Sequence, residues 1–424
     1  MGFALPGPGG LCATPGEFWH AISTGTSYVE NDGVFFGTVR TEVSDVKARF
    51  PELPKRALNY YSPVQFYGLI SLSEACTDAG LDFRAGDLRE AAVLAARDGG
   101  DCWSTPYLDI MNAKRDQVTK EEINELGTRL ALNGLPMDVA SVQVSVVGST
   151  GPSFTVSNGC TSSAVVLGLA HRMIANGELD VAVVTGADCF GIDFIQHYAG
   201  LIDRYNELNA LEGGTLDAME DSALAMTQLM RPYDKTSPGS NMGNGSITLV
   251  LESREHAERR GAPGYARMTA QSTRRSPQRS VFAIDRQGAG MVLAARQAMA
   301  AAGIDAEQID YVNGGAEGDP VFHETESNIM HSLFGDRASS MPVTVQEACF
   351  GHHGGPLGNL GVAASALMLQ RDEVCPTAGC REPADECDFD PVPGTAVRPM
   401  RVDHALSLNY TVGMVSSAIL LTKV

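Results

Sequence analysis

Residues 153–188 combine a strand, a polar turn with a cysteine, a helix and a second strand. The first strand is predicted from the β-branched and aromatic run Phe154–Val156, after which three small or polar residues lead to Cys160. Beyond the cysteine, apolar residues recur at helical spacing as far as Asn176-Gly177, a typical helix stop. The apolar run Val181–Val184 predicts a buried strand. The order predicts a βαβ unit with a thiol at its strand-to-helix turn.

The position of Cys160 favours a nucleophilic thiol. Unpaired backbone N–H groups and the positive end of the dipole in the first turn of a helix stabilise a thiolate. Small residues around the cysteine leave room for a substrate: Gly159, Ser162, Ser163 and Ala164. A buried structural cysteine is the commoner fate of a lone core cysteine. The polar turn favours the nucleophile.

Composition limits the class of protein. With 424 residues and 44% hydrophobic residues, the chain can bury a large core, as two packed halves or one large α/β domain. No apolar run approaches the ~20 residues that span a bilayer, and MGFALPGPGG has no basic start typical of a signal peptide. Nine scattered cysteines favour a reducing, cytoplasmic location. The net charge of −20 argues against nucleic acid and anionic membranes as partners.

The second half of the chain repeats the order of the first. Residues 342–375 again read as a strand, a polar turn, a helix of small residues and a charged exit. We therefore predict an internally duplicated fold with halves at 1–253 and 254–424, related by a pseudo-twofold axis. Such a duplication would bring the turns of Cys160 and His352 together.

Other stretches are less distinctive. Helices are predicted at 63–80 and 288–303, a loop-rich insertion at 30–60, and excursions from the core at 97–128 and 189–230. Three cysteines and a histidine near the C-terminus lack the paired CxxC spacing of a zinc site, so no metal is expected: Cys375, Cys380, Cys387 and His404. One basic run is a candidate docking patch for an acidic partner: Arg254, Arg259, Arg260, Arg274, Arg275 and Arg279.

Five segments resemble the β-ketoacyl synthases among the condensing enzymes of fatty-acid and polyketide synthesis. They occur in the family's order: TVSNGCTSSA with VAVVTGAD, RPYDKTSPGSNMGNGSITLVLE, YVNGGAEGDPVFHETE, CFGHHGGPLGNLG and ALSLNYTVGMVSSAILL. The resemblance implies an α/β, thiolase-like fold with an internally duplicated, five-layered αβαβα architecture.

The resemblance also implies roles for particular residues. Cys160 matches the nucleophile that accepts an acyl group, and the backbone N–H of that cysteine forms part of the oxyanion hole. Val412 and Gly413 lie in the segment that replaces the family's second, glycine-rich oxyanion loop. The resemblance implies acyl groups delivered as phosphopantetheine or CoA thioesters by an acyl carrier protein or acyl-CoA, with no other cofactor. It implies a homodimer, or pairing with a second ketosynthase-like subunit.

Departures from the family pattern bear on the chemistry. Gly315 stands where the family has its first catalytic histidine, whereas His352 matches the second. Glu347 replaces the family's lysine five residues before that histidine, and Glu326 matches its acidic partner. The pattern predicts two facing carboxylates where the family has an ion pair.

The missing histidine favours acyl transfer over decarboxylation. Removing one donor from an oxyanion-type site typically costs ~100–1000-fold in rate. Transfer to an amine, alcohol or other non-malonyl nucleophile needs only one base, for which His352 is the candidate. In one alternative, His323 or His353 fills the vacated place and restores decarboxylation. In another, the chain is a non-catalytic subunit like a chain-length factor, although such subunits usually replace the cysteine.

Overall fold

The computed structural model describes residues 1–424 apart from 100–111, 134–136, 194, 197–225, 278–283 and 412–414. Two five-stranded sheets form its centre. The first has the order β1 (Gly2–Ala4), β7 (Gly245–Glu252), β6 (Val181–Asp188), β4 (Ala92–Arg97) and β5 (Ser153–Ser157). The second has the order β8 (Arg267–Arg275), β14 (Val415–Thr422), β13 (His404–Tyr410), β9 (Tyr311–Asn313) and β10 (Val343–Thr344).

The two sheets share one pairing pattern. In the first, β1 and β7 are antiparallel, as are β7 and β6, whereas β4 runs parallel to both β6 and β5. In the second, β8, β14 and β13 pair antiparallel in turn, and β9 runs parallel to β13 and β10. The predicted duplication is therefore present in the strand topology.

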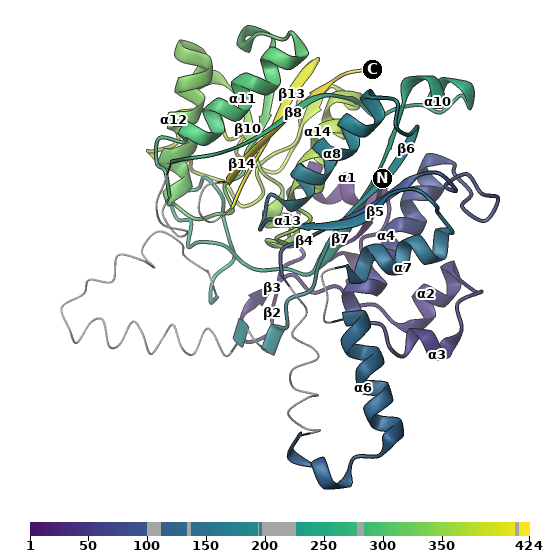
Figure 1. The fold of residues 1–424 in the computed structure, drawn as a ribbon. Coiled ribbons are helices and arrows are strands. Elements are labelled where there is room, and N and C mark those ends of the chain that lie inside the picture. Colours follow the sequence, from purple (N-terminus) through teal and green to yellow (C-terminus); the bar gives the residue numbers. More distant parts are fainter. Residues whose placement is uncertain (100–111, 134–136, 194, 197–225, 278–283, 412–414) are drawn as a thin grey trace, which may run out of the picture.

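Helices separate and cover the sheets in five layers (Figure 1). α8 (Ser162–Ala175) and α14 (Leu357–Arg371) pack on each other between the two sheets. α4 (Pro63–Ala79) and α7 (Asp138–Val147) cover the outer face of the first sheet, and α11 (Ala289–Ala302) covers that of the second beside α12 (Val321–Phe334). The buried, small-residue surface of α14 allows this close central contact. The fold is thiolase-like, as predicted.

Local sequence signals explain the helix ends. α1 (Pro15–Thr24) begins with a capping box between Thr14 and Glu17 and ends at Gly25 in the left-handed conformation. α4 likewise ends at left-handed Gly80. Further elements of the described chain are η1 (Pro8–Gly10), η2 (Arg115–Gln117), α6 (Lys120–Asn133), α10 (Arg254–Arg259), η3 (Ala306–Gln308), η4 (Gly335–Ser340), α13 (Glu347–Phe350), β11 (Glu373–Val374) and β12 (Arg398–Pro399).

Residues 30–60 contain more regular structure than predicted. They form a small hairpin, β2 (Glu30–Asn31) with β3 (Phe35–Phe36), and two short helices, α2 (Val43–Arg49) and α3 (Lys55–Leu58). α2 packs on α4 and buries Val46 completely. A seven-residue helix gives too few turns for its apolar period to be recognised in the sequence.

The predicted excursions are described only in part. α6 projects away from the layered core (Figure 1), while much of 97–128 and most of 189–230 lie outside the described residues. Among the residues that are described, no helix is long and apolar enough to cross a membrane.

Candidate active site

The nucleophile turn joins β5 to α8. Gly159 adopts a φ of 60° there, and a Cβ on it would lie 2.1 Å from the Thr411 hydroxyl oxygen, so only glycine fits. The next residue, Cys160, is buried with 7% of its surface exposed. The turn thus buries the thiol, and its backbone lies against Thr411, directly after β13.

His352 meets Cys160 from the other half of the chain. The Cys160 Sγ lies 3.2 Å from His352 Nε2. Gly351, with a φ of 91°, turns the chain after α13, and the His352 N–H donates to the Asn241 carbonyl at 2.7 Å. The structure therefore brings together the cysteine and the histidine that the sequence analysis singled out.

Glu347 supports the far side of the imidazole. Its Oε2 lies 2.7 Å from His352 Nδ1, and its side chain is 7% exposed. The single turn of α13 returns this carboxylate to the histidine five residues later. With Nδ1–H donated to the carboxylate, Nε2 is left facing the sulfur. The Cys160 sulfur, the His352 imidazole and the Glu347 carboxylate therefore contact one another in series, and we call this series the Cys160–His352–Glu347 line.

Two further carboxylates lie beside Cys160 and His352, and neither was predicted from the sequence. Glu317 Oε2 is 3.3 Å from His352 Nδ1, and its side chain is 21% exposed. Asp98 Oδ2 is 3.7 Å from the Cys160 sulfur. Glu317 follows Gly315 within a segment already quoted, whereas Asp98 is reached only because β4 and β5 are neighbours. Their positions depend on tertiary contacts.

The donor atoms of Cys160, His352 and Glu317 all lie within 4.8 Å of one another. A thiolate, an imidazole and a carboxylate are ordinary zinc ligands. They are equally the groups that a nucleophile and its acid–base partners require. Because Glu347 already engages the imidazole, the arrangement fits the second description directly.

Burial and charge shift the titration of these groups in opposite ways. Burial raises the pKa of the Cys160 thiol to about 11, although His352 acts to lower it. Burial alone would lower the pKa of His352, but the charges of Glu317, Cys160 and Glu347 raise it well above its usual value. The thiol therefore depends on the imidazole for deprotonation.

Glu317 is also perturbed. Burial raises its pKa to about 7; His352 opposes this, while repulsion from Glu347, Asp319 and Asp98 adds to it. A carboxyl group with this pKa can exchange a proton near neutrality.

Glu326 does not face Glu347 as predicted. Its carboxylate accepts hydrogen bonds from the hydroxyl groups of Tyr233 and Tyr410 and, at 2.6 Å, from the Gly315 N–H. Burial raises its pKa, and the charge of Glu347 adds to this rise. The prediction was wrong because Glu347 turns to His352 and the two tyrosines satisfy Glu326. The carboxylate that approaches Glu347 is Glu317.

Tyr410 fills the space beside Gly315. A Cβ on Gly315 would lie 2.9 Å from the Tyr410 ring, so the ring occupies the space that a side chain at 315 would need. His323 does not fill it, because its Nε2 accepts the Tyr233 N–H at 3.1 Å. His353 packs against Gly245 instead. Burial lowers the pKa of His323 to about 4 and that of His353 to about 3, so both are neutral.

Only part of the predicted oxyanion site can be placed. Val412 and Gly413 lie outside the described residues. The N–H of Cys160 donates to the Thr411 hydroxyl oxygen at 3.3 Å. An acyl oxygen that used this N–H would have to displace Thr411 from it.

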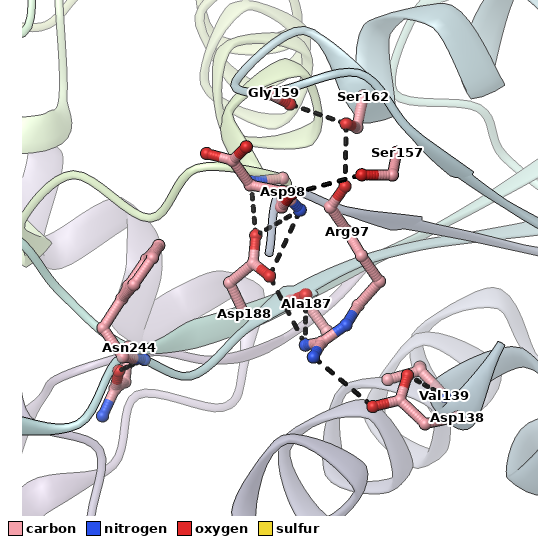
Figure 2. A network of polar contacts seen from close by, with 12 residues as sticks. Arg97, Asp98, Asp138, Val139, Ser157, Gly159, Ser162, Ala187, Asp188 and Asn244 are labelled. Atoms are coloured by element: carbon pink, nitrogen blue, oxygen red, sulfur yellow. Dashed lines mark hydrogen bonds and ion pairs between the residues drawn. The ribbon is translucent and has the colours of Figure 1, made fainter. Parts of the chain in front are cut away.

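A buried ionic network supports the nucleophile turn from below (Figure 2). Arg97, 1% exposed, lies 3.4 Å from carboxylate oxygens of both Asp138 and Asp188. Asp188 accepts the backbone N–H of Asp98 at 2.9 Å and that of Gly355 at 2.6 Å. Burial raises the pKa of Asp188 to about 7, against the opposing charge of Arg97. The network ties the ends of β4 and β6 to the loop that precedes α14.

Comparisons with known proteins show the family to which the chain is related. Sequence models of the β-ketoacyl synthase N-terminal and C-terminal domains match residues 6–195 and 265–381. A "putative polyketide beta-ketoacyl synthase 1" from Streptomyces virginiae is 30% identical over 435 residues, covering 100% of this chain and 96% of the relative. The tetracenomycin polyketide synthase ketoacyl synthase alpha subunit from Streptomyces glaucescens is 28% identical, with coverage of 100% and 96%.

Solved structures give the same fold. The "ishigamide ketosynthase/chain length factor" aligns with a TM-score of 0.79 at 21% identity, covering 100% of this chain and 98% of the other. A β-ketoacyl synthase from Burkholderia phymatum aligns with a TM-score of 0.75 at 20% identity, with the same coverage. Taken with the two domain matches, these relatives show that the chain belongs to the β-ketoacyl synthase family.

Proposed function

We propose that this protein is an acyltransferase that forms an acyl thioester on Cys160 and passes the acyl group to a non-malonyl nucleophile. The observation that carries the proposal is the line from Cys160 Sγ through His352 to Glu347, with contacts of 3.2 and 2.7 Å. An activated cysteine with an oriented base is the arrangement used in covalent acyl transfer.

The first half-reaction follows from this line. His352 Nε2 accepts the proton of the Cys160 thiol, and Glu347 stabilises the resulting imidazolium through Nδ1. The thiolate attacks the carbonyl carbon of the incoming thioester, and the bond from that carbon to the carrier sulfur breaks. His352 returns the proton to the departing thiolate. The products are acyl-Cys160 and a free carrier thiol.

Two features disfavour decarboxylation of a malonyl group. Gly315 offers no side-chain donor to an enolate oxygen, and Tyr410 occupies the space beside it. Losing such a donor typically costs ~100–1000-fold. The malonyl carboxylate would also approach Glu317 and Asp98, both close to the reacting sulfur. Two like charges about 5 Å apart repel by about 3 kcal/mol at an effective dielectric constant of 20.

The delivery of substrate is part of the same proposal. We infer that an acyl carrier protein or CoA supplies the acyl group as a phosphopantetheine thioester, in a cytoplasmic, polyketide-type pathway. Relatives described as polyketide ketosynthases support this inference. One structural neighbour is a complex of a ketosynthase with its acyl carrier protein, and another is a ketosynthase/chain length factor. A homodimer is expected, with a paired subunit as the alternative.

Intact-mass measurement tests the proposal. The protein is incubated with acetyl-, hexanoyl- and decanoyl-pantetheine, and acyl adducts are mapped by peptide digestion. We expect an adduct on Cys160 in the wild type and none in Cys160→Ala. Cys349→Ala is the matched control, because Cys349 is buried with its Sγ against the Ala21 carbonyl. No adduct with any thioester would favour a non-catalytic subunit and refute the proposal.

A further inference from the structure

Transfer of the acyl group from Cys160 to an amine acceptor requires a second base in the site. This argument rests on the proposed acyl transfer. An amine acceptor is an ammonium ion near neutral pH, and it must lose two protons to become an amide nitrogen. The Cys160–His352–Glu347 line supplies one mobile base, His352 Nε2. A second proton acceptor is therefore required if the acceptor is an amine.

Glu317 lies where that second base would act. Its carboxylate oxygen is within 4.8 Å of the Cys160 sulfur and 3.3 Å from His352 Nδ1. The carbonyl carbon of an acyl-cysteine lies about 1.8 Å beyond the sulfur, and an attacking atom approaches it to about 3–3.5 Å. A nitrogen at that distance can reach the Glu317 carboxylate by a hydrogen bond.

Glu317 is more exposed to solvent than Glu347 and His352, and its charge suits a cationic acceptor. Its side chain is 21% exposed, whereas those of Glu347 and His352 are 7% and 5% exposed. Glu317 thus remains partly accessible from outside, as does Asp98 beside the sulfur. Glu317 contacts His352, and Asp98 adds a further carboxylate beside the sulfur. The two carboxylates favour a cationic acceptor.

We propose that Glu317 is a catalytic residue of the transfer step, the base that takes the first proton from a primary amine acceptor at acyl-Cys160. The ammonium gives one proton to the Glu317 carboxylate and becomes a neutral amine. The nitrogen attacks the acyl carbon and the C–N bond forms. Neutral His352 takes the second proton, the C–S bond breaks, and Cys160 leaves as a thiolate paired with the imidazolium. Glu317 then releases its proton to solvent.

A comparison of two nucleophiles that differ in charge tests the role of Glu317 in the acyl-enzyme. Propylamine arrives as an ammonium and must lose two protons, whereas hydroxylamine is uncharged near neutral pH and loses only one. Acyl-Cys160 is formed with the pantetheine thioester that loads best, and its decay is followed by intact mass with each nucleophile. The readout is the ratio of the two discharge rates, which cancels differences in loading.

We expect the ratio of propylamine to hydroxylamine discharge to fall at least tenfold in Glu317→Gln, in line with the ~100–10,000-fold that general bases contribute. Glu317→Asp keeps a carboxylate and should recover part of the ratio. Glu307→Gln, on the exposed 3₁₀ helix η3, is the control and should keep the wild-type ratio. A wild-type ratio in Glu317→Gln, or an Asp variant no better than Gln, would overturn the assignment.

The outcomes also distinguish this inference from the proposed function. Failure of the wild type to form acyl-Cys160 refutes the acyltransferase itself. Formation of acyl-Cys160 that discharges to both nucleophiles with a ratio independent of residue 317 refutes only the role of Glu317.

Discussion

Replacement of Glu347 by glutamine isolates the contribution of its charge to thiol activation. The 2.7 Å hydrogen bond to His352 Nδ1 joins two buried groups, and the carboxylate raises the pKa of the imidazole. A hydrogen bond to a charged group is worth about 1.5–3 kcal/mol. At 1.36 kcal/mol per factor of ten, this loss corresponds to a fall of about 10–150-fold in the rate of Cys160 acylation.

The pH dependence should change in the same variant. Without the Glu347 charge the pKa of His352 falls, so the imidazolium stabilises the thiolate less and the pKa of Cys160 rises further. Because neutral His352 is then available at lower pH, the rise of the acylation rate with pH should move to more acidic pH and reach a lower plateau. A glutamine can also donate its amide hydrogen to Nδ1, which leaves the wrong tautomer and deepens the loss.

Rapid-quench intact-mass measurement of acyl-Cys160 formation across a pH series provides the assay. Glu307→Gln removes one negative charge at an exposed site and serves as the control for net charge. An acylation rate within twofold of wild type in Glu347→Gln, with an unshifted pH profile, would refute the role of this carboxylate.

Three other predictions follow from the same geometry. Cys160→Ala should abolish covalent loading without loss of the folded state, checked by intact mass and a thermal melt, and residual loading would place the acyl group elsewhere. Tyr410→Phe removes a donor from buried Glu326 and should destabilise the protein by about 1–3 kcal/mol in urea unfolding, unless that hydrogen bond is dispensable. The folded protein holds a proton on Glu317 between about pH 4.5 and 7 that the unfolded chain has released, so unfolding free energy should decrease as pH rises through this window. Glu317→Gln should lessen that decrease, and parallel urea-stability profiles for the two proteins would contradict the raised pKa.

The sequence predicted the fold because its signals are local. The strand, turn and helix around Cys160 and their counterpart near His352 each carry their own pattern of apolar and small residues. The pairing of strands in two equivalent sheets then follows from duplication. The helices within 30–60 were missed because short helices owe their stability to packing, as Val46 shows against α4.

The site was less predictable because its contacts cross between elements. Glu347 was singled out from the sequence, but the direction of its side chain depends on the single turn of α13. Glu326 was expected to face Glu347. The two tyrosines that donate to Glu326 lie far from it in the sequence, so no local pattern indicated them. Glu317 was not predicted because the resemblance placed a histidine at position 315, and the interpretation of this segment followed the glycine found there. The carboxylate two residues after that glycine was the available clue.

Carbon dioxide release measured together with acyl discharge tests the central claim most directly. Acyl-Cys160 is supplied with malonyl-pantetheine and propylamine in competition, and the carbon dioxide formed is counted against acyl groups lost from Cys160. The proposed transfer to a non-malonyl nucleophile predicts an amide product and far less than one carbon dioxide per acyl group. Release of one carbon dioxide for each acyl group lost, with a β-ketoacyl product, would show a decarboxylative synthase and contradict the account.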